Sequence, residues 1–441
     1  MKSFSVTRGR QRQLARIGLA VLAIAAHPHA ALAIDLADQP LFATIAVPSG
    51  NLALALSVEW PTATTPAYPT TTAYDATSTF LGYFDPKKCY SYVVVNSGTT
   101  AAPDYSTSYF APSSAAVQQA CDSSDAPLWS GNYLNWASMQ TLDAFRWVLT
   151  GGYRSVDTTS STVLTKTYAA QDNAAMPQKT LASSALAGAT PFTTDKWTTG
   201  ATTRLRKLGT RMWITGTATG SKDLVNGAQT TGATPYTGQN SHVGNNGVKS
   251  ADPGTTYELY INVKVCDSAT AVGGAEANCK LYGSSSYKPE GLMQQYASKL
   301  RYSAFGYYNH SGDTSQQRDG GVMRARMNYI GPTQPVPGST PIANPTAEWS
   351  ATTGIMATNP DPSDATDTTN FAAAAGWTVP IANSGVMNYL NKFGYAAQSY
   401  KSKDPVSELY YAVVRYYKNL GNVASYTSLA GAGSSATARL V

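Results

Sequence analysis

The first 33 residues constrain the fold most, because they indicate the compartment in which the chain folds. They open with five basic residues and no acidic one, at Lys2, Arg8, Arg10, Arg12 and Arg16. An apolar run over residues 17–26 follows, and Ala31-Leu32-Ala33 provides the small residues of a signal-peptidase site. The run is too short to cross a bilayer as a permanent helix. We interpret residues 1–33 as a cleaved signal peptide, and an uncleaved amphipathic anchor is the alternative.

Charge argues against a nucleic-acid partner. The 32 basic and 26 acidic residues give a net charge of +6, and loss of the five basic residues of the signal peptide reduces it to +1. The mature chain keeps no long block of Lys and Arg, which a nucleic-acid binder needs to contact phosphates. It also has no later apolar stretch long enough for a transmembrane helix.

Four cysteines remain, Cys89, Cys121, Cys266 and Cys279. An even number of cysteines in an exported chain predicts two disulfides, because the compartment is oxidising. Pairing between neighbours, Cys89 with Cys121 and Cys266 with Cys279, is our preferred connectivity, although three connectivities are possible. Neither pair has the close spacing of zinc or thioredoxin sites, so we expect a structural role.

The first half of the chain predicts a buried strand and a helix. Residues 51–58 form a nearly continuous apolar run, typical of a strand buried on both faces in the middle of a parallel sheet. From Asn132 to Leu149, apolar residues recur at the helical period. Ser130 is expected to cap this helix, and Gly151-Gly152 to end it.

The second half predicts alternating strands and helices. Residues 257–265 alternate as a strand does, Pro289-Glu290 opens a helix, and residues 302–308 form a further strand. This succession favours a βαβ unit and an α/β sheet. Short helices are predicted at 384–393 and after Asp404-Pro405. The buried face of the last helix is expected to consist of Val406, Leu409, Val413, Tyr416 and Leu420.

Two stretches, residues 159–255 and 333–380, lack this periodicity. The first is rich in Thr, Gly, Ser, Ala and Asn, and the second in Pro, Thr and Asp. We interpret both as long irregular insertions, the first made of loops and small hairpins or partly disordered. Tyrosines within the insertions are candidates for adhesive contacts, since aromatic faces suit sugars and protein partners.

Several motifs, taken in order, resemble the PilY family of type IV pilus biogenesis factors, which includes the PilC adhesins. The clearest is Trp129-Ser-Gly-Asn-Tyr-Leu-Asn-Trp-Ala-Ser-Met139, followed by Leu142-Asp143, Gly151-Gly152-Tyr153-Arg154 and Val156-Asp157-Thr158. Similar segments are residues 51–63, 82–90 with the first cysteine, 263–267 with 278–279 and 288–291, 319–325, 383–389 and 403–411. The resemblance covers most of residues 40–420 outside the two insertions.

The resemblance implies an α/β fold, namely a von Willebrand factor A-like three-layer sandwich with long irregular insertions. Its expected parts are a signal peptide (1–33), A-like segments (34–158, 256–332 and 381–441) and the insertions (159–255 and 333–380). Family members continue into a β-propeller with a calcium-binding loop. We expect that propeller to be absent here, the A-like core to be incomplete at the C-terminus, and no cofactor to bind this chain.

Candidate chemistry is sparse. An A domain that binds metal carries a D-x-S-x-S pattern after its first strand, but residues 57–62 read Ser-Val-Glu-Trp-Pro-Thr, with Glu59 as the one acid. Asp361, Asp364 and Asp367, and likewise Asp313 and Asp319, lack the ordered ligand series of a calcium loop, so we interpret them as solvated turn carboxylates. The mature chain has two histidines, His242 and His310, both in unpatterned segments. We predict no enzyme activity and no metal or catalytic residue.

The sequence therefore predicts a non-enzymatic type IV pilus biogenesis and tip-associated adhesion factor that contacts minor pilins or the pilus-tip complex. A host or abiotic surface is a further expected partner. The alternative is a free-standing secreted A-like module that binds a matrix protein or a glycan. We expect export to the periplasm and then to the outer membrane, cell surface or pilus tip.

The motif residues expected to be structural are Trp129, Gly131, Asn132, Asn135, Trp136, Asp143, Gly151, Gly152 and Arg154. Trp147 is also expected in the core.

Overall fold

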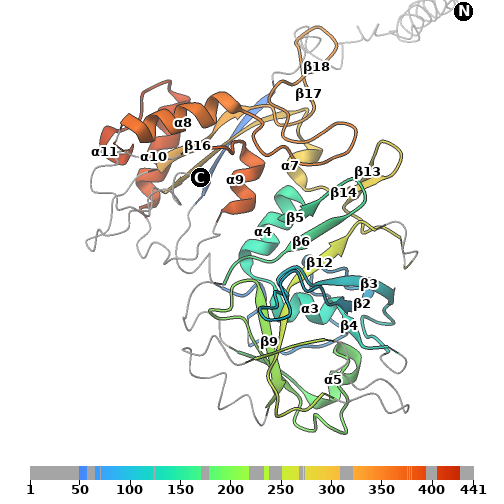
Figure 1. Ribbon diagram of the computed structural model, residues 1–441. Coiled ribbons are helices and arrows are strands. Elements are labelled where there is room, and N and C mark those ends of the chain that lie inside the picture. Colours follow the sequence, from blue (N-terminus) through green and yellow to red (C-terminus); the bar gives the residue numbers. More distant parts are fainter. Residues whose placement is uncertain are drawn as a thin grey trace, which may run out of the picture. The chain divides into compact units, whose positions relative to one another are not determined.

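The protein is a mixed α/β structure with several sheets (Figure 1). The computed structural model describes residues 49–56, 65–69, 71–122, 126–169, 178–217, 233–237, 251–267, 272, 274–307, 321–374, 376, 378, 380–393 and 405–427. The expected signal peptide, Glu59, His242, His310, Asp313, Asp319 and Asp404 lie outside these residues. None of the described helices combines the length and apolar character that a bilayer crossing requires.

A six-stranded sheet has the order β4-β2-β3-β12-β6-β5. Its strands are β2 (Lys88–Val93), β3 (Tyr109–Ala115), β4 (Leu128–Ser130), β5 (Arg154–Asp157), β6 (Thr162–Thr165) and β12 (Asn262–Val265). Neighbouring strands are antiparallel except β3 and β12, which pair in parallel. The sheet joins strands that are up to about 170 residues apart in the sequence, so it forms only when distant segments meet.

A five-stranded sheet has the order β10-β11-β9-β8-β7. Its strands are β7 (Lys179–Leu181), β8 (Ala201–Arg204), β9 (Arg211–Gly216), β10 (Thr234–Pro235) and β11 (Tyr257–Tyr260). Four of them belong to the stretch expected to be an irregular insertion. The small hairpins expected there are present, since β7–β8 and β8–β9 pair in antiparallel orientation, but they join an ordered sheet in which β8 is fully buried.

The third sheet has the order β1-β15-β16, with β1 (Gly50–Leu56), β15 (Leu300–Tyr307) and β16 (Gly321–Asn328). β1 pairs with β15 in parallel, and β15 pairs with β16 in antiparallel orientation. The strand expected at residues 51–58 is confirmed, but its expected place in the middle of a sheet is wrong. Within the described residues β1 is an edge strand, and much of it is exposed.

Helices and two hairpins complete the described structure. The helices are α3 (Gly131–Ser138), α4 (Thr141–Thr150), α5 (Ser183–Ala189), α7 (Leu292–Gln295), α8 (Pro362–Ala374), α9 (Val386–Lys392), α10 (Val406–Tyr417) and α11 (Ala424–Thr427). The hairpins pair β13 (Cys279–Tyr282) with β14 (Ser286–Pro289), and β17 (Thr333–Gln334) with β18 (Ile342–Ala343). Helices α9 and α10 both contact β16 (Figure 1).

The helix expected from Asn132 to Leu149 is in fact two helices. Met139 and Gln140 are extended between them, and their backbone binds the segment at residues 65–67. Ala67 N–H donates to Met139 O, and Thr141 N–H donates to Thr65 O. The predicted ends are confirmed. Ser130 Oγ accepts the Tyr133 N–H, and Gly151 ends α4 with a φ of 81° that favours glycine.

Three further helix predictions need correction. Pro289 ends β14, and α7 has only four residues, because the backbone there pairs with the β13 hairpin. The strand predicted at residues 257–265 is split into β11 and β12, and these two strands and β15 belong to three different sheets, so they form no βαβ unit. The stretch 333–380 contains the 13-residue helix α8. In α10, Leu409 and Val413 are buried as expected, but Val406 is 51% exposed, and Leu420, which lies beyond the end of α10, is 49% exposed.

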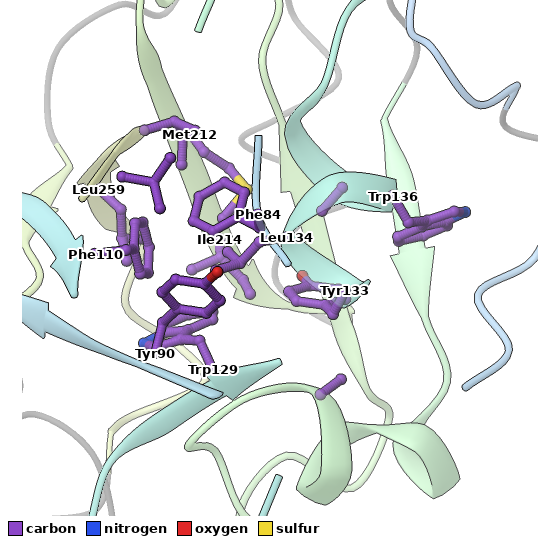
Figure 2. Packing of buried hydrophobic residues seen from close by; sticks show 14 of the residues in the cluster. Phe84, Tyr90, Phe110, Trp129, Tyr133, Leu134, Trp136, Met212, Ile214 and Leu259 are labelled. Carbon is purple, nitrogen blue, oxygen red and sulfur yellow. The ribbon is translucent and has the colours of Figure 1, made fainter. Parts of the chain in front are cut away.

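The largest core is aromatic. It surrounds Trp129, whose ring meets Phe110, Phe192 and Tyr236 edge-on, with ring centroids 6.0, 5.4 and 5.5 Å away. Figure 2 shows part of this cluster, with Trp129 beside Tyr90 and with Leu259 and Ile214 from the five-stranded sheet. Edge-on aromatic pairs stabilise a core beyond the area that they bury. Tyr236, a tyrosine of the first insertion, is therefore a core residue and no adhesive candidate.

Two disulfides have the preferred connectivity. Cys89 bonds Cys121 with a Cα–Cα distance of 5.7 Å, and Cys266 bonds Cys279 with 5.6 Å. The first bridge ties β2 to the segment before β4. The second ties the end of β12 to the start of β13, across a loop of 13 residues. The structural role assigned to the four cysteines is thus supported by their geometry.

Removal of either bridge should destabilise the fold. We expect replacement of Cys266 and Cys279 by serine to lower the free energy of unfolding by roughly 2–4 kcal/mol, and replacement of Cys89 and Cys121 by somewhat more, because their loop is longer. Urea denaturation measures both effects. As a control, maleimide labelling of the folded, unreduced protein should detect no thiol. Four reactive cysteines in that control would refute the bridges.

Candidate functional site

Several motif residues lie on the consecutive elements α3, α4 and β5, and with the neighbouring Arg146 they define what we call the motif junction: Asn132, Asn135, Asp143, Arg146 and Arg154. The first two lie on α3 and have no solvent exposure. Asn132 Oδ1 accepts the Phe80 N–H at 2.7 Å, and its Nδ2 donates to Ser78 O at 2.9 Å. These bonds hold the loop at residues 78–85, which precedes the first cysteine, against α3.

Asn135 binds the same loop more extensively. Its Nδ2 donates to Phe80 O at 2.8 Å and to Phe84 O at 2.7 Å, while its Oδ1 accepts the Phe84 N–H at 3.1 Å. Glycines allow this close approach. A Cβ on Gly82 would collide with Asn135, and a Cβ on Gly131 would collide with the carbonyl of Asp85. A buried irregular loop needs such partners, because its backbone groups have no water to bind.

Asp143 and Arg146 continue the junction on α4. Asp143 Oδ2 accepts the Gln140 N–H at 2.8 Å and so caps the helix, while its Oδ1 accepts the Thr167 N–H at 2.6 Å. The buried Arg146 guanidinium donates to the carbonyls of Leu390 and Phe393 at the end of α9. A cation at a helix C-terminus satisfies carbonyls that the helix leaves unpaired. Arg146 thereby joins segments 244 residues apart.

Two buried lysines support the junction. Lys166 Nζ donates to Gln140 Oε1 and Thr167 O, both at 2.6 Å, and burial lowers its pKa to about 8 while Asp143 opposes the shift. Lys179 lies 4.8 Å from the ring centroid of Trp136 and donates to the Trp136 carbonyl. Burial lowers the pKa of Lys179 to about 7. No local sequence pattern distinguishes these lysines from surface lysines.

Gly151, Gly152 and Arg154 bring β14 against the end of α4. Gly151 lies so close to the carbonyl of Pro289 that a Cβ would collide with it, and a Cβ on Gly152 would press on Leu164. Arg154 donates to Pro289 O at 2.7 Å and to Gly354 O at 2.8 Å. It also pairs with Asp157 at 3.1 Å. Each of the nine motif residues is buried or fixes backbone of another segment, and their structural role stays a prediction.

Lys88 connects the two disulfides. It precedes Cys89, is 3% exposed, and pairs with Glu276 at 2.9 Å. The other oxygen of Glu276 accepts the Cys266 N–H at 2.6 Å. Cys266, Glu276 and Cys279 place three possible metal ligands within 4.8 Å of one another. Both sulfurs are bonded in the disulfide, however, so they offer no thiolate to a metal, and the group serves to join the two cysteine regions.

An open cleft of about 400 Å³ lies beside the junction, and we call it the motif cleft. The first cysteine region forms one wall, α4 and the second cysteine region form others, and Gln295 of α7 adds a polar group. The lining residues are Leu81, Gly82, Tyr83, Phe84, Asp85, Pro86, Lys87, Trp147, Leu164, Val265, Glu276, Ala277, Asn278, Pro289 and Gln295. Trp147, expected in the core, is only partly buried because it faces this cleft. Apolar walls with a few polar groups suit the binding of a protein side chain.

The acidic cluster has a different role from the one expected. Asp361 is 8% exposed, and its Oδ1 accepts the Asp364 N–H at 3.1 Å at the start of α8. Arg326 of β16 pairs with Asp364 at 3.1 Å and with Asp367. Burial raises the pKa of Asp364, and Arg326 opposes the shift. Asp361 and Asp364 therefore lie at the start of α8 and not in a solvated turn, whereas the Asp367 side chain, 67% exposed on α8, is solvated as expected.

Comparison of the sequence with known proteins finds one matching family model and relatives of the same kind. A family model described as "PilY1 homolog, small alpha/beta domain" matches residues 71–226. A type IV pilus biogenesis factor PilY1 homolog of Xylella fastidiosa is 39% identical over 410 residues, which is 90% of this chain. The two matches support a PilY/PilC-like family member. It spans 30% of the length of that relative.

A second PilY1 homolog of Xylella fastidiosa is 50% identical over 44 residues, or 10% of this chain and 3% of that protein. No solved structure gives a significant match. The family model covers α3, α4 and their loop, so the motif junction lies within the matched region. It also covers β7, β8 and β9, in agreement with the ordered sheet formed by much of the first insertion.

Loss of the Asn135 amide should destabilise the junction. In Asn135→Ala, three buried backbone groups of Phe80 and Phe84 lose their partner, and we expect the free energy of unfolding to fall by roughly 2–4 kcal/mol. Asn422→Ala, at an exposed asparagine, is the matched control and should change it by less than about 0.5 kcal/mol. Thermal unfolding compares the two. Equal melting temperatures would contradict the role of Asn135.

The buried carboxylate of Glu348 should make the stability of the fold depend on pH. Glu348 accepts the Val386 and Met387 N–H groups at 2.8 and 2.6 Å, at the start of α9, and burial raises its pKa to about 7 although these hydrogen bonds oppose the shift. Because the folded pKa exceeds the ordinary value of 4.5, the folded state holds the proton more tightly. The stability from this group is present at low pH and is lost as the pH rises to about 7.

We therefore expect Glu348→Gln to flatten the pH dependence of stability between pH 4.5 and about 7. The wild type should lose up to about 3 kcal/mol relative to the variant across this range, since one pKa unit corresponds to about 1.4 kcal/mol. Melting temperatures of both proteins at the two ends of the range give this difference directly, and a constant offset between them would contradict it.

Proposed function

We propose that this protein acts in type IV pilus biogenesis, as a non-enzymatic, tip-associated adhesion factor that contacts minor pilins. The observation that carries the proposal is the 39% identity with a type IV pilus biogenesis factor over most of the chain. That relation also supports an exported protein associated with the cell envelope or the pilus. The two disulfides agree with export, because such bonds persist in oxidising compartments.

The motif cleft is the surface that we propose for the contact with a pilin. It is lined by the loop that Asn132 and Asn135 hold, so its shape depends on the motif junction. Leu81, 51% exposed, and the partly buried Trp147 provide apolar area, and Asp85 and Lys87 provide polar groups around it. A buried apolar or aromatic side chain of the pilin, bordered by hydrogen bonds, would fit this pattern.

The fold supports the A-like interpretation in part. β1 and β15 are parallel neighbours, and the antiparallel β16 lies beside them with α9 and α10 against it. Layers of helices on a partly parallel sheet are typical of α/β sandwiches. We propose that residues 49–56 and the described part of 300–427 belong to such a module, with the small α/β domain inserted after β1.

The test is complementation. Deletion of the gene should reduce the pilin that can be sheared from the cell surface, and expression of this chain should restore it. In the same assay, Leu81→Asp should fail to restore surface pilin, because it places a charge in the motif cleft. Leu281→Asp is the matched control, since Leu281 is 43% exposed and does not line the cleft.

The outcomes separate the alternatives. Unchanged surface pilin and twitching in the deletion strain would refute biogenesis and favour a secreted module for a matrix protein or glycan. Restoration by both variants would support biogenesis but refute the cleft as the contact. Both variants should first show the wild-type melting temperature, so that loss of folding is not mistaken for loss of contact.

A further inference from the structure

A buried lysine and a buried glutamine face each other beside α4. Lys166 follows β6 and Gln140 precedes α4, and the two residues are 1% and 0% exposed. Lys166 Nζ lies 2.6 Å from Gln140 Oε1. Because a carbonyl bond is about 1.2 Å long, this contact places Nζ within roughly 3–4 Å of Gln140 Cδ. That separation is close to the one at which an amine and a carbonyl carbon held by a protein react.

The charges around Lys166 do not balance. In the part of the chain that the structure describes, the charged groups that act on its ammonium are Asp143 and Arg146. Two cations are therefore buried with one carboxylate. Beside Gln140, the acceptors of Nζ are two further neutral carbonyls, Thr167 O at 2.6 Å and Gly209 O at 3.3 Å. Burial of such a cation is costly and lowers the pKa of Lys166 to about 8, which favours the neutral amine.

Asp143 holds both residues in place. Its Oδ2 accepts the Gln140 N–H at 2.8 Å, and its Oδ1 accepts the N–H of Thr167, the residue after Lys166, at 2.6 Å. One carboxylate thus fixes the backbone on both sides of the contact between Nζ and Oε1. Groups held at reacting distance behave as if their concentration were very high, and this offsets the low reactivity of an amide.

We propose that Lys166 and Gln140 form an isopeptide bond inside the folded chain. The neutral Lys166 amine attacks Gln140 Cδ, and the bond between Nζ and Cδ forms. A proton then moves from Nζ to Nε2, the bond between Cδ and Nε2 breaks, and ammonia leaves. The ammonia takes up the proton that the lysine ammonium gave up before the attack. The chain thereby loses one positive charge, and the step needs no oxidant, reductant or cofactor.

The product suits the buried site better than the separate side chains do. Departure of ammonium removes one of the two cations and leaves Arg146 with Asp143. The remaining N–H of the new amide can donate to Thr167 O, which lies 2.6 Å from Nζ. Both ends of the bond are buried, so water has little access to hydrolyse it.

The bond ties the start of α4 to the end of β6, across 26 residues of the sequence. A covalent tie restricts the unfolded chain as a disulfide does, and it therefore stabilises the fold. Trp147 of α4 and Leu164 of β6 both line the motif cleft, so the bond also holds two walls of that cleft together. The bond forms without any pilin, and its test is independent of the proposed function.

Mass spectrometry of the folded chain, unfolded and reduced just before the measurement, tests the proposal. We expect the wild type to be lighter than the mass given by its sequence by one ammonia. Lys166→Arg keeps the positive charge but lacks the amine, and Gln140→Met lacks the amide, so both variants should have the full mass. Lys196→Arg, at an exposed lysine, is the matched control and should lose ammonia as the wild type does.

Digestion with trypsin locates the bond. Trypsin does not cut after an acylated lysine, so the chain should stay uncut after Lys166, and the peptide with Lys166 should be joined to the one with Gln140. Ammonia is also lost when an Asn-Gly sequence such as Asn226-Gly227 forms a succinimide. That loss would persist in Lys166→Arg and would leave the two peptides separate, which would overturn the proposal.

Refolding gives a measurement that needs no variant to fold. Wild-type chain recovered in urea before it folds should have the full mass and should lose ammonia only after refolding, because the two side chains meet in the folded state. Full mass of the folded wild type would overturn the proposal. A loss of ammonia that takes place equally in urea would also overturn it, since folding would then have no part in the reaction.

Discussion

The structure around the motif cleft depends on two buried side-chain amides that replace water for an irregular loop. Asn132 and Asn135 satisfy backbone groups of residues 78–84, which no helix or sheet can satisfy. An unpaired buried backbone group costs about 1–3 kcal/mol, so Phe80 and Phe84 could not stay buried without these partners. The loop in turn positions Lys88 and the first disulfide. Asn132 and Asn135, which belong to the strongest motif of the sequence, therefore fix the position of this loop.

Buried charged side chains also hold segments together, and these segments are farther apart in the sequence. Lys88 and Glu276 join the two disulfide regions, and Arg146 joins α4 to the end of α9. Each charge is matched by carbonyls or an opposite charge, as burial requires. With 13% charged residues overall, the chain uses several of its few charges inside the fold. Low surface charge leaves apolar and hydroxyl-bearing side chains as the main means of contact with partners.

The sequence was informative where local chemistry decides the structure. The cap at Ser130, the glycine end of α4, the disulfide pairing and the existence of β1 could all be predicted from nearby residues. The edge position of β1 could not, because neighbouring strands come from distant segments. The hydrogen-bond partners of Arg146 could not be predicted either, since they lie 244 and 247 residues away in the sequence. In α8 and β8, tertiary packing outweighs a Thr-rich composition that suggests loops.

The roles of the aromatic residues were the hardest to predict from the sequence, because some of these residues lie in the core and others remain accessible. Trp129, Trp136 and Tyr236 belong to one core, in which the edge-on contact between Trp129 and Tyr236 joins β4 of the six-stranded sheet to the segment after β10 of the five-stranded one. Trp147 of the motif cleft and Tyr410 of α10 remain accessible to different degrees. The cleft is concave and bordered by polar groups, which suits selection of a particular side chain.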